Sequence, residues 1–153
     1  MDVIDKKILR LVQQDARMTN KEMALKLQMS VTAVYERIRK LEREGVVKKY
    51  VALLDRTKID KAFVVFCHVK LIQHAKDYLM RFESEVIKLP EVLECFHVSG
   101  DYDYILKIAV KDMETYRDFM VTKLTGLQHI GSTHSSFMIG EIKNSTAFEM
   151  ESN

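Results

Sequence analysis

The sequence predicts an α+β protein with two domains, an N-terminal winged helix-turn-helix and a ferredoxin-like βαββαβ domain behind it. Two observations predict this fold class. Residues 2–44 carry three segments with helical apolar spacing, and the β-branched and aromatic residues of 47–54 follow them as a strand. From residue 63 onward, the patterns come in the order strand, helix, strand, strand, helix, strand. At 153 residues the chain is long enough for two small domains.

The first two predicted helices are short and amphipathic. Residues 2–14 place four apolar side chains on one face: Ile4, Ile8, Leu11 and Val12. The second helix begins behind Thr19, because the stretch from Thr19 to Glu22 has the form of a capping box. Its apolar positions are Met23, Ala24 and Leu27. Only two residues separate this helix from the next, so the two helices meet at a tight turn.

The third helix determines the functional interpretation of the first domain. Ser30 is a good N-cap, and Gly45 supplies the left-handed residue that ends the helix. Its narrow apolar stripe consists of Val34, Ile38 and Leu41. A short turn holds this helix across the second one, so its polar face projects from the domain. That geometry suits entry into a DNA major groove, with the trailing strand at 47–54 as the wing.

The start and the polar face of the third helix carry eight candidate DNA contacts: Ser30, Thr32, Ala33, Glu36, Arg37, Arg39, Lys40 and Arg43. Thr32, Ala33 and Glu36 lie near the helix start and are short enough to meet base edges. Phosphates are the expected partners of Ser30, Arg39, Lys40 and Arg43, with Lys48 and Lys49 of the wing adding charge to the same side. Arg37 lies nearer the apolar stripe, which leaves a positioning role and base readout both open. Taken alone, the pattern also fits an ordinary amphipathic helix with a solvated face.

The predicted boundaries are residues 1–54 for the DNA-binding domain, 55–62 for a short ordered linker and 63–153 for the second domain. The linker is polar but not rich in Pro or Ser. Residues 1–60 contain 14 Lys+Arg and 9 Asp+Glu, whereas residues 61–153 contain 10 and 13. The resulting net charges of +5 and −3 favour a nucleic-acid-binding first domain, although a +5 domain is also compatible with mere solubility.

The second domain begins with a predicted strand at 63–72 whose core face carries Val65, Cys67, Val69 and Leu71. A helix over 75–89 ends before Pro90, the only proline. Strands at 92–100 and 104–110 follow, then a helix capped by Asp112, and a last strand from Ile130. In a ferredoxin-like domain both helices cover one face of an antiparallel sheet. The other face must be covered by something else.

Three large apolar side chains on predicted strands are candidates for that second face: Phe66, Phe96 and Phe137. A sheet with an exposed apolar face in so small a domain commonly pairs with a copy of itself. We therefore expect a homodimer. Two-fold symmetry also suits a helix-turn-helix, because it brings two recognition helices to successive major grooves about 34 Å apart.

The stretch SVTAVYERIRKLEREGVVKKY resembles the signature of the leucine-responsive/asparagine-regulator (Lrp/AsnC, feast/famine) family of transcription regulators. The matching positions are Ser30, Ala33, Val34, Arg37, Ile38, Leu41, Glu42, Gly45, Val46, Val47 and Tyr50. The start of the first helix is also similar to that family, at Asp5, Ile8 and Leu9. The resemblance covers nearly the whole chain. It implies double-stranded DNA as a partner, dimers packed through their sheets, and assembly of four dimers into an octamer.

The turn between the second and third strands of the second domain has two interpretations. An isolated Gly-Asp turn is usually a plain hairpin. The family resemblance instead implies an effector-binding loop made of Ser99, Gly100, Asp101, Tyr102 and Asp103, with further contacts from Thr133, His134 and Ser135. The implied effector is a free amino acid. Amides around Gly100 would bind its carboxylate, and Asp101 or Asp103 would accept its ammonium group.

Other classes of function have little support in the sequence. No catalytic residue is predicted, because no Ser/His/Asp or Cys/His set and no phosphate loop stands out. We expect no metal and no cofactor besides the effector, since the five His show no ligand spacing. Cys67 and Cys95 have no CxxC spacing and are expected as buried thiols. No apolar run approaches the ~20 residues of a membrane span, so we expect a cytoplasmic protein.

The sequence therefore predicts a sequence-specific transcription regulator that responds to an amino acid. One alternative is a sequence-tolerant architectural DNA-binding protein whose second domain serves only assembly. Another is a small-molecule-binding or enzymatic protein whose helix-turn-helix does not engage DNA. A fold alone does not decide between them.

Overall fold

The computed structural model describes residues 1–150, which divide into two compact units. The first unit comprises Met1–Leu53 together with residues 143–150, and the second is Leu54–Ile142. Residues 143–150 thus pack with the first unit, whereas the predicted second domain runs to residue 153. Each unit is described by itself.

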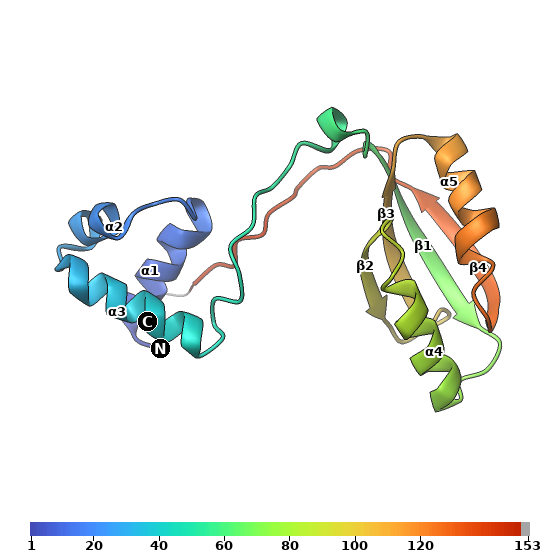
Figure 1. Cartoon of the computed structure of the whole chain (residues 1–153), viewed down its shortest axis with the longest axis horizontal. Helices are drawn as coiled ribbons and strands as arrows, with labels where there is room; N and C mark the ends of the chain where they lie inside the picture. Colours follow the sequence, from blue (N-terminus) through green and yellow to red (C-terminus); the bar gives the residue numbers. More distant parts are fainter. Residues whose placement is uncertain (151–153) are drawn as a thin grey trace. The chain divides into compact units, whose positions relative to one another are not determined.

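The first unit contains three helices, α1 (Val3–Gln14), α2 (Asn20–Leu27) and α3 (Val31–Arg43) (Figure 1). The caps predicted at Thr19 and Ser30 are confirmed: Thr19 forms a capping box, and the Ser30 hydroxyl accepts from the Ala33 amide at 3.1 Å. Asp2, which was not predicted as a cap, forms a capping box at the start of α1. Gly45 has φ +71°, which only glycine adopts without strain, directly behind α3. The buried core consists of Ile8, Leu9, Met23, Ala24, Val34, Ile38 and Leu41. The helix-turn-helix is confirmed.

The prediction of a wing strand at 47–54 is wrong. No residue of that segment belongs to a β-strand. The amides of Val46 and Val47 instead bond the Leu41 carbonyl, at 2.9 and 3.2 Å, which folds the start of the segment onto the end of α3. Strand propensity describes how well side chains suit a pleated sheet, but a strand forms only where a second strand is available to pair with it.

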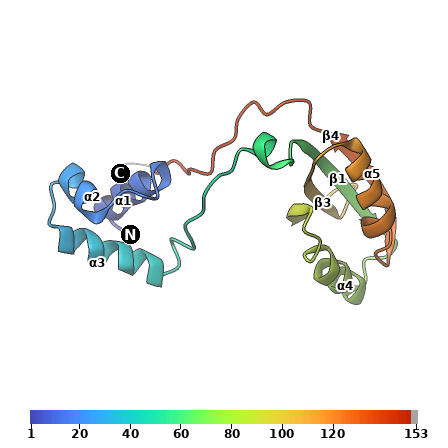
Figure 2. The ribbon, with the colours of Figure 1, turned by 45° about the horizontal axis from the view of Figure 1, so that its top comes forward.

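The second unit is a four-stranded antiparallel sheet with the order β2-β3-β1-β4. Its strands are β1 (Phe63–Leu71), β2 (Val92–His97), β3 (Tyr104–Val110) and β4 (Ile130–Phe137), and its helices are α4 (Lys76–Val86) and α5 (Met113–Phe119). The helix α5 continues as a π-helical turn, η2 (Met120–Leu124), and a 3₁₀ turn, η1 (Arg56–Ile59), precedes β1. Both helices cover one face of the sheet (Figures 1 and 2). The predicted ferredoxin-like order is therefore confirmed.

The two faces of the sheet differ sharply in burial. The helix-covered face holds the core, with Val65, Cys67, Val69, Leu106 and Ile108 fully buried. On the opposite face the Phe66 and Phe96 side chains remain exposed, at 37% and 52%. Phe137 does not belong to this open face, because it lies opposite Val65 in the β1–β4 register and its ring meets the Tyr116 ring edge-on at 5.8 Å. The prediction that Phe137 faces outward with Phe66 and Phe96 is wrong.

Residues 143–150 return to α1 in the first unit. The Gln13 side-chain amide donates to the Phe148 carbonyl at 3.1 Å and accepts from the Phe148 amide at 2.7 Å. Arg10 bonds the Met150 carbonyl, and Met150 packs against the core of the three helices. Within residues 1–150, no helix has both the length and the apolar character needed to cross a membrane.

Candidate functional site

The outward face of α3 presents most of the predicted DNA contacts to solvent. Thr32, Glu36, Arg39 and Arg43 are exposed, whereas Ala33 and Lys40 are half-buried. Val34, Ile38 and Leu41 bury the opposite stripe, so this helix is fixed by its apolar side and free on its polar side. The face therefore offers two guanidinium groups for phosphates and two short polar side chains near the helix start for bases.

Arg37 is half-buried and bonded to other residues of the first unit. Its Nη1 atom lies 2.7 Å from Oδ2 of Asp2, the N-cap of α1, and 2.7 Å from Oδ1 of Asp5 in the first turn of α1. Asp5 is completely buried, and Lys40 Nζ lies 3.9 Å from its other oxygen. The paired carboxylates raise the pKa of Arg37. The positioning role is the one that this geometry supports, because the guanidinium joins α1 to α3 and neutralises a buried charge.

Tyr50, behind α3, belongs to a second polar chain. Its hydroxyl donates to Oε1 of Glu42 at 3.0 Å, and Oε2 of Glu42 pairs with Nη1 of Arg39 at 3.3 Å. Burial, followed by the contact with Glu42, raises the pKa of Tyr50. Glu42 and Tyr50 were matching positions of the family resemblance, but without the fold nothing indicated that they bond each other.

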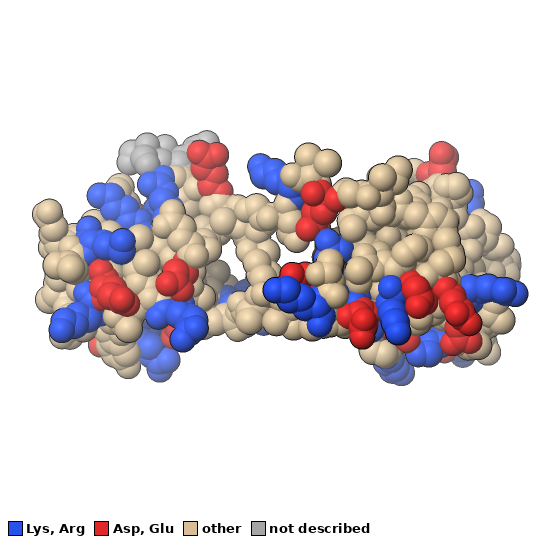
Figure 3. Space-filling model, turned by 90° about the horizontal axis from the view of Figure 1, so that it is seen from above, with Lys and Arg blue, Asp and Glu red and all other residues tan. Residues whose placement is uncertain are grey.

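The charge of the first unit is mixed. On the face shown in Figure 3, basic and acidic side chains are interspersed over the first unit and do not form a uniformly basic surface. The basic residues of α3 are partly offset by Glu36 and by Glu42, which already pairs with Arg39. We expect electrostatic attraction to DNA to come from a few positioned cations, and not from net charge.

The two carboxylates of the loop between β2 and β3 have different environments. Oδ2 of Asp103 accepts from the Leu71 amide at 2.7 Å, and its Oδ1 lies 3.1 Å from Nε2 of His74. Asp103 therefore anchors the loop to the end of β1. Asp101 is exposed and makes no bond within residues 1–150. Of the two predicted ammonium acceptors, Asp101 is the one left available.

The backbone of the same loop is open to an anion. Gly100 has φ +125°, a conformation that side-chain-bearing residues rarely adopt. Within the described residues, the amides of 99–102 donate to no acceptor, while Val98 and Asp103 on either side are hydrogen-bonded. Unpaired amides that follow one another along a turn form a concave site for a carboxylate or phosphate.

The three predicted contacts on β4 fall on opposite faces of the sheet. Ser135 and Thr133 lie opposite Cys67 and Val69 on the helix-covered face, and Ser135 bonds the Tyr116 hydroxyl at 2.6 Å. Only His134 faces the open side. The structure thus brings together His134 and Tyr102 but separates Thr133 and Ser135 from them, because successive residues of a strand point to opposite faces.

His68 joins this open-face cluster and was absent from the predicted site. Its ring lies 5.1 Å from the Tyr102 ring and 6.0 Å from the His134 ring. The alternation along β1 already placed His68 opposite the core, and this was the available signal. The open face thus carries a cluster of three rings beside the loop, which we call the aromatic floor: Tyr102, His68 and His134.

The described residues hold no group of three or more His, Cys, Asp or Glu side chains that could bind a metal ion. Cys67 is a buried free thiol, as predicted, whereas Cys95 is free but only half-buried; burial raises the pKa of each. A raised pKa keeps a thiol protonated and unreactive near neutral pH.

Two family models match the chain. The Lrp/AsnC ligand binding domain matches residues 64–148, and a winged helix-turn-helix DNA-binding domain matches residues 1–48. The Bkd operon transcriptional regulator of Pseudomonas aeruginosa is 36% identical over 142 residues, which is 93% of each chain. The leucine-responsive regulatory protein of Escherichia coli K12 is 38% identical over 145 residues, covering 95% of this chain and 88% of that protein.

Two solved structures are similar to nearly all of this chain. A transcriptional regulator from Neisseria meningitidis, determined as a complex with L-Met, has a TM-score of 0.93 and 33% identity and covers 97% of this chain and 96% of its own. An AsnC family transcriptional regulator from Agrobacterium tumefaciens has a TM-score of 0.92 and 35% identity, with 97% of both chains covered. Together with the helix-turn-helix and the antiparallel sheet, these similarities show that the chain belongs to the Lrp/AsnC family of transcriptional regulators.

Proposed function

We propose that this protein regulates transcription by binding specific DNA sites through α3 and that a free amino acid, bound at the loop of residues 99–103, controls this activity. The observation that carries the DNA part is the division of labour on α3. Arg37 is committed to α1, while Arg39 and Arg43 face solvent beside Thr32 and Glu36. A helix fixed on one side and free on the other is what groove recognition requires.

DNA binding is tested by replacing Arg39, Lys40 and Arg43 with Ala. Each phosphate contact that is lost should reduce the slope of log affinity against log salt by about 1. Thr32 or Glu36 variants should instead change which sequence is preferred in selection from a random pool. An unchanged salt slope in the triple variant would remove this face from the interface.

The amino-acid site is supported by the unpaired amides of 99–102, the exposed Asp101 carboxylate and the nearby aromatic floor. The L-Met complex of the Neisseria regulator supports the same class of ligand. We infer that the amides bind the α-carboxylate and that Asp101 accepts from the α-ammonium group. Calorimetric titration with the twenty amino acids tests the site, with Gly100→Ala as the loop variant. A Cβ atom at position 100 would meet no other atom within 4 Å, so the added methyl group causes no clash. Alanine is strained at the φ of +125° found there, so this variant should disturb the backbone of the loop and weaken amino-acid binding.

We further infer a homodimer that covers the open sheet face, with four dimers assembling into an octamer in the cytoplasm. The exposed Phe66 and Phe96 rings support this face as the contact. Light scattering at tens of micromolar tests it. Phe66→Asp should shift the protein to smaller oligomers, because it places a charge on the open sheet face. Phe137→Asp should weaken the packing of α5 against the sheet and leave the oligomeric state unchanged. A monomeric wild type would contradict the proposal.

A further inference from the structure

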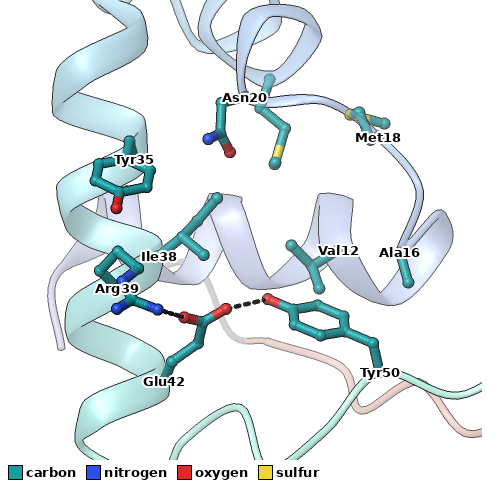
Figure 4. A pocket seen from close by; sticks show the side chains of 10 residues that line it. Val12, Ala16, Met18, Asn20, Tyr35, Ile38, Arg39, Glu42 and Tyr50 are labelled. Atoms are coloured by element: carbon teal, nitrogen blue, oxygen red, sulfur yellow. Dashed lines mark hydrogen bonds and ion pairs between the residues drawn. The ribbon is translucent and has the colours of Figure 1, made fainter.

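A hollow of about 330 Å³ lies beside α3 in the first unit (Figure 4). Val12, Met23 and Ile38 contribute its apolar lining. Its polar lining comes from the first residue of α2 and from one flank of α3, namely Asn20, Tyr35, Arg39 and Glu42, with Tyr50 alongside. Apart from Arg39, none of these residues was among the predicted DNA contacts.

Two of the polar side chains have no use inside the fold. Within residues 1–150, neither the Asn20 amide nor the Tyr35 hydroxyl makes a hydrogen bond, and Tyr35 is 46% exposed. The Tyr35 hydroxyl and the Asn20 amide are therefore available to bond a group from outside the fold. Arg39 is the third donor, with a side chain that is 61% exposed. Figure 4 shows these three side chains around one open space.

We propose that Asn20, Tyr35 and Arg39 form a seat for one phosphate of the DNA backbone. Amide, phenol and guanidinium groups are all phosphate donors in protein–DNA complexes, and arginine supplies the charge. The seat lies on the flank of α3 and not on its outermost face, where the base-reading positions Thr32 and Glu36 lie. A DNA strand that borders the major groove occupied by α3 would run past this flank of the helix. The inference rests on the proposed DNA binding and adds a positioning contact to it.

Glu42 decides how readily the seat is filled. Its carboxylate pairs with Arg39 at 3.3 Å and accepts from the Tyr50 hydroxyl at 3.0 Å. An incoming phosphate must therefore replace Glu42 as the partner of Arg39. This exchange is feasible, because an exposed ion pair three residues apart on a helix contributes only a few tenths of a kcal/mol.

Affinity and salt dependence separate the three donors. On a duplex selected by the wild-type protein from a random pool, Asn20→Ala and Tyr35→Phe should each weaken binding about tenfold. Neither change removes a charge, so the slope of log affinity against log salt should stay that of the wild type. Arg39→Ala should weaken binding and lower that slope by about 1. Glu42→Gln should strengthen binding about two- to fivefold, because it removes the competing carboxylate.

Phosphate-ethylation interference identifies the phosphate itself. In the wild type, ethylation at one backbone position should block binding, and Tyr35→Phe and Asn20→Ala should both lose sensitivity at that same position. Matched controls are Tyr78→Phe and Asn144→Ala, which should bind as the wild type does. Thermal melts should be unchanged, since Asn20 and Tyr35 bond nothing in the fold. Titration with inorganic phosphate distinguishes a seat for DNA from a site for the free anion.

The outcomes are separable. The proposed seat would be contradicted if Asn20→Ala and Tyr35→Phe both bound DNA with wild-type affinity and an unchanged interference pattern. That result would leave the proposed DNA binding intact. Absence of salt-dependent DNA binding in the wild type would instead overturn the proposed function. Tight binding of inorganic phosphate that both variants abolish, without any change in DNA affinity, would assign the hollow to a free anion and reject the DNA contact.

Discussion

Each unit carries two identical charged residues two positions apart, and in each pair only one residue is bonded to a distant segment of its unit. In α3, Arg37 joins Asp2 and Asp5 while Arg39 reaches solvent. In the loop before β3, Asp103 holds the Leu71 amide while Asp101 is exposed. Helical periodicity explains the first division, since two positions turn the side chain by about 200°. No such period explains the second, which depends on a hydrogen bond to a distant strand.

The largest effect should separate the two arginines. Arg37→Ala leaves the fully buried Asp5 carboxylate with Lys40 as its nearest cation, at 3.9 Å. We expect a loss of about 3 kcal/mol, near the low end for an uncompensated buried charge because Arg37 is one-third exposed. Arg39→Ala should change stability by less than about 0.5 kcal/mol. Hydrogen exchange of α1 and α3 measures both, with the sheet amides as an internal reference.

A smaller effect should separate the two aspartates. Asp103→Ala leaves the Leu71 amide without its acceptor, which should cost about 1–3 kcal/mol locally at the end of β1. Asp101→Ala should leave exchange at β1 unchanged and weaken amino-acid binding about tenfold or more, because a charged hydrogen bond is lost. Asp103→Asn, which keeps an acceptor oxygen, serves as the control. Equal effects of the two alanine variants on β1 would contradict the division.

The two faces of β4 should also differ, because Ser135 lies on the helix-covered face and His134 on the open face. Ser135→Ala removes the bond to the Tyr116 hydroxyl and should cost about 1 kcal/mol in thermal unfolding of the second unit. Burial already raises the pKa of Tyr116 to about 12, and the Ser135 bond opposes that rise. Spectroscopic titration of the phenol should therefore show a higher pKa in Ser135→Ala. His134→Ala should leave the Tyr116 titration as it is in the wild type.

The smallest effect is the pH dependence of the Arg37 contact. A backbone bond from Asp5, followed by the bond to Arg37, lowers the pKa of Asp2 below 3.8. A carboxyl whose pKa is depressed on folding stabilises the fold above its unfolded value and loses that contribution as pH falls through the folded value. Exchange of α1 should quicken slightly more in the wild type than in Asp2→Asn on acidification below pH 4. Parallel profiles would show that Asp2 is not linked to folding.

Local signals in the sequence predicted most of the fold. The caps at Thr19, Ser30 and Asp112 act on neighbouring amides, so these three helix starts could be located without tertiary information. Alternation along β1 likewise gave the core face of the sheet. The prediction of a strand at 47–54 was wrong because a strand forms only beside a second strand, and the residue types of one segment do not reveal whether a second strand is available.

The candidate site was predicted less completely, for reasons of pairing and register. Thr133, His134 and Ser135 were grouped by proximity in sequence, although a strand sends neighbours to opposite faces. Arg37 could be placed near the apolar stripe, but its partners Asp2 and Asp5 lie more than thirty positions away. The bond between Gln13 and Phe148 spans 135 positions and left no signal in either segment.

Because residues 143–150 return to α1, the chain passes between the two units twice, once at 53–54 and once at 142–143. After a cut at 53–54, the second unit stays covalently attached to residues 143–150, and these hold the helices of the first unit only through their own contacts with α1. A site-specific protease cut at 53–54 followed by size-exclusion chromatography would therefore measure how strongly that short segment binds α1.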